Sequence, residues 1–121
     1  MSGFGALDEL LSVNDVQGVV LLDRRGRVVR THLPGTVNVP TFAVMVASMY
    51  DAAINVAEEF AKPPPGRIDV RTPSGSLVIA AVGAHFLLVV SLGTWDPDAL
   101  GSRVDRVVDT LKEAVQESVA E

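Results

Sequence analysis

The side chains that most often do chemistry are few and scattered in this sequence. His32 and His85 stand alone, with no second histidine three or four residues away, and the chain has no cysteine. Zinc sites usually take closely spaced His and Cys ligands, so we expect no metal site. Ser74 and Ser76 belong to a predicted turn and lack the Gly-x-Ser-x-Gly context of a hydrolase nucleophile. The sequence therefore predicts no catalytic residue and no enzyme activity.

Nucleotide-binding loops are missing as well. There is no Gly-x-x-x-x-Gly-Lys-Ser/Thr sequence, and Gly3-Phe4-Gly5 precedes a predicted helix without a strand before it. We expect no cofactor, and we do not expect the chain to hydrolyse a nucleotide itself.

One local basic cluster remains, formed by Arg24-Arg25-Gly26-Arg27 together with Arg30. An arginine in such a cluster can neutralise transition-state charge on the phosphates of a partner that hydrolyses a nucleotide. The alternative is a solvated hairpin tip whose arginines discourage edge-to-edge aggregation. We favour the solvated tip and keep Arg24 and Arg25 as possible contacts with such a partner.

Composition limits the setting in which these residues act. The chain has 121 residues, 48% of them apolar and 21% charged, which indicates a single folded domain over residues 1–121. A net charge of −5 argues against a nucleic-acid partner. The apolar runs Leu77–Val82 and Phe86–Val90 are too short to span a bilayer, and Met1–Leu11 does not resemble a secretory signal. We expect a cytoplasmic protein that does not insert into membranes.

The first half of the chain predicts a helix, a hairpin and a longer helix. Apolar residues at helical spacing indicate a short helix over residues 4–13. Gly18–Asp23 and Arg27–Thr31 form a predicted hairpin in which Gly26 supplies a positive φ, with the second strand at an edge. The long helix runs from about Thr41 to Ala61.

This long helix has two apolar stripes and only a narrow polar line. One stripe comprises Phe42, Met45, Met49, Ala53, Val56 and Phe60, and the other comprises Ala43, Val46 or Ala47, Tyr50, Ile54 and Ala57. A surface helix needs one buried stripe, so we expect the second stripe to be covered by another chain. The alternative is an ordinary core helix that happens to be rich in alanine.

The second half predicts three strands and a helix. Arg67–Thr72, Ser76–Val82 and His85–Leu92 are separated by Pro73-Ser74-Gly75 and Gly83-Ala84, which indicates an antiparallel meander. The final helix is predicted to be capped by Thr94 or Asp96, to carry Pro97 in its first turn and to continue to the C-terminus. Its apolar stripe comprises Leu100, Val104, Val107, Val108, Leu111, Val115 and Val119. The element order α-β-β-α-β-β-β-α predicts an α+β three-layer sandwich around a five-stranded antiparallel sheet.

In this order the chain resembles the roadblock/dynein light-chain family, with its profilin-like fold. Three segments carry the resemblance, which spans about residues 5–118: Leu7-Asp8-Glu9-Leu10-Leu11, Gly18-Val19-Val20-Leu21-Leu22-Asp23-Arg24-Arg25-Gly26 and Leu87-Leu88-Val89-Val90-Ser91. The resemblance implies a homodimer in which the long helices pair and the strand after them joins across the two-fold axis. It also implies a Ras-like small GTPase as partner, regulated or scaffolded without catalysis by this chain, as in a minimal bacterial or archaeal member.

The predicted dimer contacts are Met45, Met49, Ala53, Ile54 and Val70, in the middle of the two stripes and on the joining strand. Two other functions stay open at this point. The chain can be a structural adaptor without effect on nucleotide turnover, or a sensor of a small ligand on the same fold.

Overall fold

The computed structural model describes residues 5–120, with side chains as far as residue 115. The elements are α1 (Ala6–Leu11), β1 (Val16–Asp23), β2 (Val28–His32), α2 (Val39–Glu59), β3 (Arg67–Thr72), β4 (Gly75–Val82), β5 (Phe86–Leu92), η2 (Pro97–Leu100) and α3 (Arg103–Ala120). The predicted order of elements is confirmed.

The five strands form one antiparallel sheet in the order β2-β1-β5-β4-β3. The predicted meander of β3, β4 and β5 is confirmed, and β2 lies at an edge as expected. β3 forms the opposite edge, so each of these two strands has one side without a partner strand.

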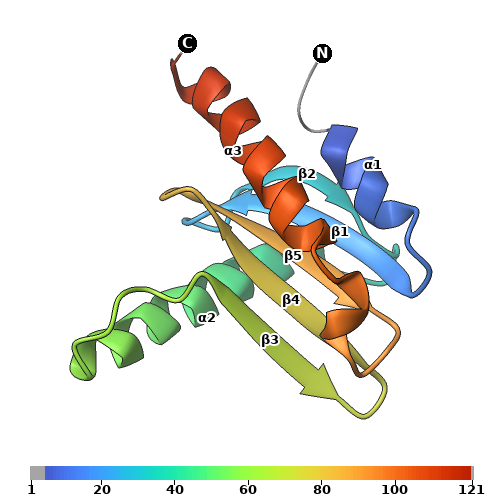
Figure 1. Ribbon diagram of the computed structural model, residues 1–121, viewed down its shortest axis with the longest axis horizontal. Coiled ribbons are helices and arrows are strands. Elements are labelled where there is room, and N and C mark those ends of the chain that lie inside the picture. The colour runs from blue at the N-terminus through green and yellow to red at the C-terminus, as the bar shows by residue number, and fades with distance from the viewer. Residues whose placement is uncertain (1–4, 121) are drawn as a thin grey trace.

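Helices cover both faces of the sheet, as Figure 1 shows. α1 and α3 pack on one face through a large core that includes Leu21, Leu88, Val90 and Leu111. α2 packs on the other face through a smaller core that includes Leu22, Val89 and Tyr50. Successive residues of the central strands therefore alternate between two cores, which explains why those strands are apolar on both faces. The predicted three-layer sandwich is confirmed.

The helix boundaries differ from the prediction by a few residues, and two of the differences have a local cause. α2 begins at Val39 because the Asn38 side chain accepts a hydrogen bond from the Thr41 amide at 3.2 Å, with a proline in the first turn. The predicted single C-terminal helix is divided into η2 and α3, since Gly101 adopts a positive φ of 57° between them. Asp96 caps η2, where its carboxylate accepts from the Asp98 amide.

The β1–β2 turn sits directly against α2. Gly26 has a φ of 90°, as predicted, and a Cβ at this position would lie 2.9 Å from the Cα of Val44. Only glycine fits both the left-handed backbone and this close approach. The hairpin tip is therefore fixed against the helix that carries the predicted dimer contacts.

Candidate partner-binding surface

α2 turns one stripe toward the sheet and the other toward solvent. Ala43, Val46, Ala47 and Tyr50 are buried. The apolar residues Met45, Met49, Val56 and Phe60 are 62%, 42%, 63% and 74% exposed, and we call these four the α2 stripe. Their positions i, i+4, i+11 and i+15 place them along the same side of the helix.

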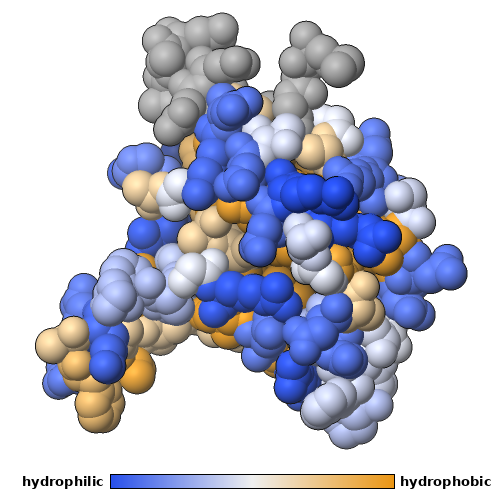
Figure 2. All heavy atoms as spheres, viewed as in Figure 1, coloured by the Kyte–Doolittle hydropathy of each residue, from blue (hydrophilic) through white to orange (hydrophobic). Residues whose placement is uncertain are grey.

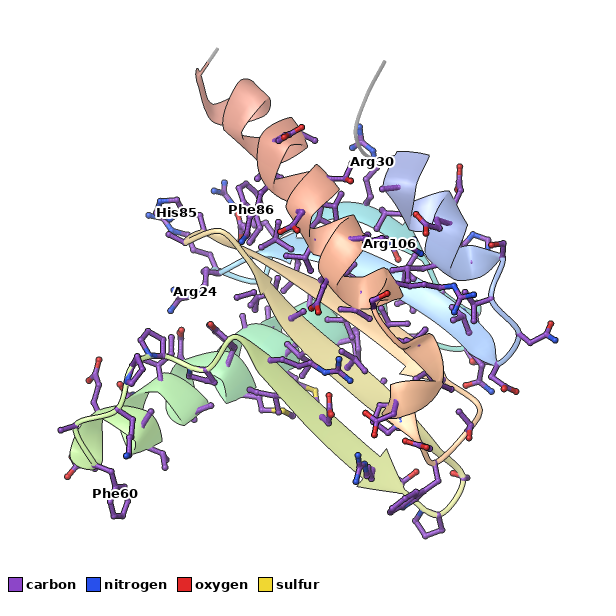
Figure 3. The ribbon with its side chains drawn as sticks, in the orientation of Figure 1. Arg24, Arg30, Phe60, His85, Phe86 and Arg106 are labelled. Carbon is purple, nitrogen blue, oxygen red and sulfur yellow. The ribbon has the colours of Figure 1, made fainter. Side chains whose placement is uncertain are left out.

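The C-terminal half of α2 extends beyond the sheet. Figure 1 shows this end projecting away from β3, and Figure 3 shows Phe60 at its tip, directed away from the sheet. Apolar atoms reach the surface along this projecting end in Figure 2. Exposed apolar side chains that gather on one element are a feature of protein interaction sites.

The other predicted contacts lie beside this stripe, with more of their surface covered. Ala53 and Ile54 are half-buried, and Ile54 packs against the α2-side core. Val70 of β3 is half-buried and pairs with Leu77 of β4. Val70 lies on the α2 face of the sheet, because its neighbour two residues back, Ile68, packs against the same core. All five predicted residues thus belong to the α2 side of the molecule.

Arg24 is tied to three parts of the fold. Its Nη2 donates to Oδ1 of Asp51 on α2 at 2.8 Å, and its Nη1 donates to the carbonyl of Ala84 in the β4–β5 turn at 3.3 Å. The guanidinium carbon lies 5.2 Å from the centre of the Tyr50 ring. Arg24 therefore anchors the hairpin tip to α2, a role that the sequence pattern did not indicate, since Asp51 and Ala84 are distant in the chain.

Arg25, in contrast, is exposed at the same turn. Together with Arg24, Arg27 and His85 it lines a basic hollow of about 310 Å³ that also includes Asp23. Figure 3 shows Arg24 and His85 beside each other at this end of the sheet. The two candidate arginines are therefore adjacent, but they occupy different environments.

Asp23 organises this turn. Partial burial raises the pKa of its carboxyl group, but the backbone N–H groups of Arg27 and Arg25 and the Arg27 guanidinium donate to it and outweigh burial. The pKa of Asp23 is therefore lowered, and the ionised carboxylate holds the tip together.

The histidines and serines that the sequence offers for chemistry do not converge on one site. His32 ends β2 and His85 lies in the β4–β5 turn, both exposed. Among the side chains that the structure describes, residues 5–115, no three His, Cys, Asp or Glu are grouped to hold a metal. The predicted turn position of Ser76 is wrong. Ser76 is buried in β4, where its hydroxyl donates to the Thr94 carbonyl at 2.9 Å. Its role is structural.

A second hollow of about 310 Å³ lies between α2 and the β4–β5 turn. Arg24 and Tyr50 are the polar side chains among its lining residues. The Nη groups of Arg24 already donate to Ala84 and Asp51, and the Tyr50 hydroxyl donates to the Pro65 carbonyl at 2.7 Å. A ligand site needs polar groups that converge on the ligand. This hollow offers few, which weakens the small-ligand hypothesis.

α2 is also the helix that, by length and composition alone, is long and apolar enough to cross a membrane. Among the described residues it is alone in this respect. The helix packs on the sheet through Tyr50 and its buried neighbours and carries Asp51 and Glu58. Its apolar character therefore has an explanation in the packing of the domain and in the α2 stripe.

The fold matches solved structures over nearly the whole chain. MglB of Myxococcus xanthus superposes with a TM-score of 0.86 at 17% identity, covering 93% of this chain and 94% of that one. The gliding protein MglB of Thermus thermophilus superposes with a TM-score of 0.86 at 21% identity, covering 95% and 89%. A Roadblock/LC7 domain from Streptomyces avermitilis gives 0.81 at 19% identity, covering 91% and 93%.

At this level of identity the structures establish the fold alone, and no curated protein matches the sequence. The family model for the Roadblock/LC7 domain, however, matches residues 6–92, from the start of α1 to the end of β5. The chain therefore belongs to the Roadblock/LC7 domain family.

Proposed function

We propose that this protein is a non-catalytic, homodimeric regulator or scaffold of a Ras-like small GTPase. The observation that carries the proposal is the α2 stripe, a row of exposed apolar side chains on the helix that the Roadblock/LC7 resemblance assigns to the dimer contact. Met45, Met49, Ala53, Ile54 and Val70 are its contacts in this proposal. The setting is the cytoplasm, without membrane insertion and without a nucleic-acid partner.

Burial of the stripe explains why it is apolar. A methionine or phenylalanine that moves from water into an interface contributes about 1.5–3 kcal/mol when fully covered. Met45, Met49, Val56 and Phe60 all lie on one side of α2, so a second copy of the helix can cover them together. Met49 is the least exposed of the four.

The dimer is tested by Met45→Asp, with Asn55→Asp as control. Met45 is 62% exposed, so an aspartate there leaves the protomer's own core intact, whereas in a dimer it places a charge in an apolar contact. Asn55→Asp adds the same charge on the polar line of the same helix. Sedimentation velocity should show a monomer for Met45→Asp and a dimer for Asn55→Asp and the wild type. Dimers of equal stability in all three proteins would place the contact elsewhere.

The GTPase partner is tested with nucleotide state as the variable. Immobilised protein is exposed to a purified Ras-like GTPase from the same organism, loaded with GDP or with a non-hydrolysable GTP analogue, and GTP turnover is measured with and without the protein. Binding in one nucleotide state with a change in turnover supports regulation. Binding in both states with unchanged turnover supports an adaptor, and no binding to any such GTPase refutes the proposal.

Arg24 and Arg25 have different expected parts in that contact. Arg24 is bonded to Asp51, so its release for a partner would break an existing ion pair. Arg25 is exposed and free to approach the acidic or phosphate groups of a partner. Loss of GTP turnover with retained binding in Arg25→Ala would support insertion of an arginine into the GTPase site.

A further inference from the structure

The edge strand β3 carries an alternating pattern of charges on one face. Arg67, Asp69 and Arg71 point to the side of the sheet that α3 covers, because Asp69 pairs with Val78 and Val78 belongs to the α3-side core. Val70 points to the opposite side, toward α2. The outer edge of this strand has no partner strand in the protomer.

The two arginines differ in their partners. Arg67 Nε donates to Oδ1 of Asp69 at 2.7 Å, so this arginine is paired within its own strand. The Arg71 guanidinium instead lies 4.8 Å from the centre of the exposed Trp95 ring, and no described carboxylate is within ion-pair distance of it. A guanidinium stacked on an aromatic ring keeps the N–H donors at its rim available. Arg71 therefore offers a charge that no described carboxylate neutralises.

Symmetry restricts how β3 can pair with β3 of a second copy. Residues directly opposite in an antiparallel pair point to the same face, and a two-fold axis perpendicular to the sheet preserves the faces. An odd-numbered residue, which points toward α3, must then face another odd-numbered residue. The pairing is consequently centred on a residue, and the centres near the middle of β3 are Ile68, Asp69 and Val70.

The charges distinguish these three registers. A centre at Asp69 places Asp69 opposite the partner's Asp69 and Arg67 opposite the partner's Arg71. Every charged residue on that face of β3 then faces a residue of the same charge. A centre at Ile68 pairs Asp69 with the partner's Arg67, but it keeps only Arg67–Asp69 of β3 opposite β3 and sets Arg71 against the partner's Pro65.

A centre at Val70 keeps Ile68–Thr72 of both copies opposite one another and sets Arg67 against the partner's Pro73, which lies just beyond the end of the strand. It places Asp69 of each copy opposite the partner's Arg71, twice by symmetry, and Val70 opposite itself on the α2 face. Asp69 then lies between Arg67 of its own strand and Arg71 from the other copy, and Arg71 gains the counter-charge that it lacks.

Within the proposed homodimer, in which the family resemblance already implies that β3 joins β3 of a second copy, we propose the register centred on Val70, with Asp69 of each copy facing Arg71 of the other. The inference rests on the proposed homodimer and adds the contact that selects its register. Trp95 holds Arg71 over the face where the partner's carboxylate arrives. The sequence Arg-x-Asp-x-Arg is complementary to itself in this register, so it favours a second copy over a relative with other charges on this strand.

The test uses two single substitutions, Arg71→Asp and Asp69→Arg, and their mixture. In the proposed register residues 69 and 71 of the two copies face each other twice. In the Arg71→Asp dimer both of these pairs consist of two aspartates, and in the Asp69→Arg dimer both consist of two arginines. Each variant alone should weaken the dimer by about 10- to 100-fold in Kd, as measured by sedimentation at low salt. When the two are mixed, every aspartate again faces an arginine, so a heterodimer should form with an affinity close to that of the wild type. This rescue also shows that both variants are folded.

Each other outcome rejects the register in a recognisable way. A tighter dimer for Arg71→Asp indicates the centre at Asp69, where the new aspartate would face Arg67. An unchanged Kd for Arg71→Asp, with a wild type that dimerises, indicates the centre at Ile68 or an edge without contact. A wild type that stays monomeric at every concentration refutes the homodimer itself. Salt gives a second readout, because about 1 M NaCl should screen most of the difference between the variants and the wild type.

Discussion

Replacement of Arg24 by alanine tests whether this residue is an anchor of the fold. The change removes an ion pair to Asp51 whose side chains are 36% and 53% exposed, a long hydrogen bond to the Ala84 carbonyl and the contact with the Tyr50 ring. An exposed ion pair contributes about 0.2–1 kcal/mol and an exposed cation–π contact about 0.5–1 kcal/mol. The buried Nε of Arg24 has no hydrogen-bond partner among the described residues, which offsets part of this gain.

The expected loss is therefore about 1–2 kcal/mol, or about 4–8 °C in Tm for a domain of this size. Urea unfolding at a fixed protein concentration, followed by the fluorescence of the single tryptophan Trp95, measures it. Arg25→Ala is the matched control. It removes the same charge at the neighbouring position, where the side chain is exposed, and it should change the free energy of unfolding by less than about 0.5 kcal/mol.

A double-mutant cycle with Asp51→Ala then isolates the ion pair. Its coupling energy should be about 0.3–1 kcal/mol, because the pair is more than a third exposed. Equal losses for Arg24→Ala and Arg25→Ala, together with zero coupling to Asp51, would refute the assignment of Arg24 as an anchor. Arg24 would then have to be regarded again as a residue available to a partner.

Three further predictions concern the positions that shape the same end of the domain and its core. Gly26→Ala should lose about 1–3 kcal/mol of unfolding free energy, because φ is positive and the new Cβ would meet α2, whereas Gly35→Ala, with open space around it, should lose much less. Because the pKa of Asp23 is lowered by folding, the stabilisation from its carboxylate is complete above the unfolded pKa of about 3.9 and is lost as the pH falls through the folded pKa. The difference in unfolding free energy between wild type and Asp23→Asn should therefore shrink between pH 7 and pH 3. A constant difference would contradict this. Ser76→Ala should cost about 1 kcal/mol by leaving the Thr94 carbonyl without its donor, and thermal unfolding of the exposed Ser74→Ala gives the comparison.

Most of the fold could be predicted because its signals are local. The apolar strands β4 and β5 and the turn at Gly26 each depend on neighbouring residues, and each was found within a few positions of its place. The break at Gly101 was missed because the apolar spacing from Leu100 to Val104 suits a continuous helix, and periodicity alone does not show a backbone turn within it.

The surface was harder to predict than the core. The two stripes of α2 are equally apolar in sequence, so only the packing shows that Tyr50 is buried and Met45 is exposed. The turn sequence alone indicates a solvated Arg24, whereas the side chain binds Asp51, which lies 27 residues away in the chain. Such pairings depend on how the elements meet in space, and a single sequence contains no signal for them.

The division of the interior into two unequal cores has a consequence for local unfolding. From residue 51 to residue 60, α2 has no fully buried side chain, whereas both faces of β5 are buried. Amides at this end of α2 should therefore exchange with solvent deuterium through small openings, long before those of β5, which need global unfolding. A partner that covers this end would have to suppress those openings, so its protection against exchange would map the bound surface residue by residue.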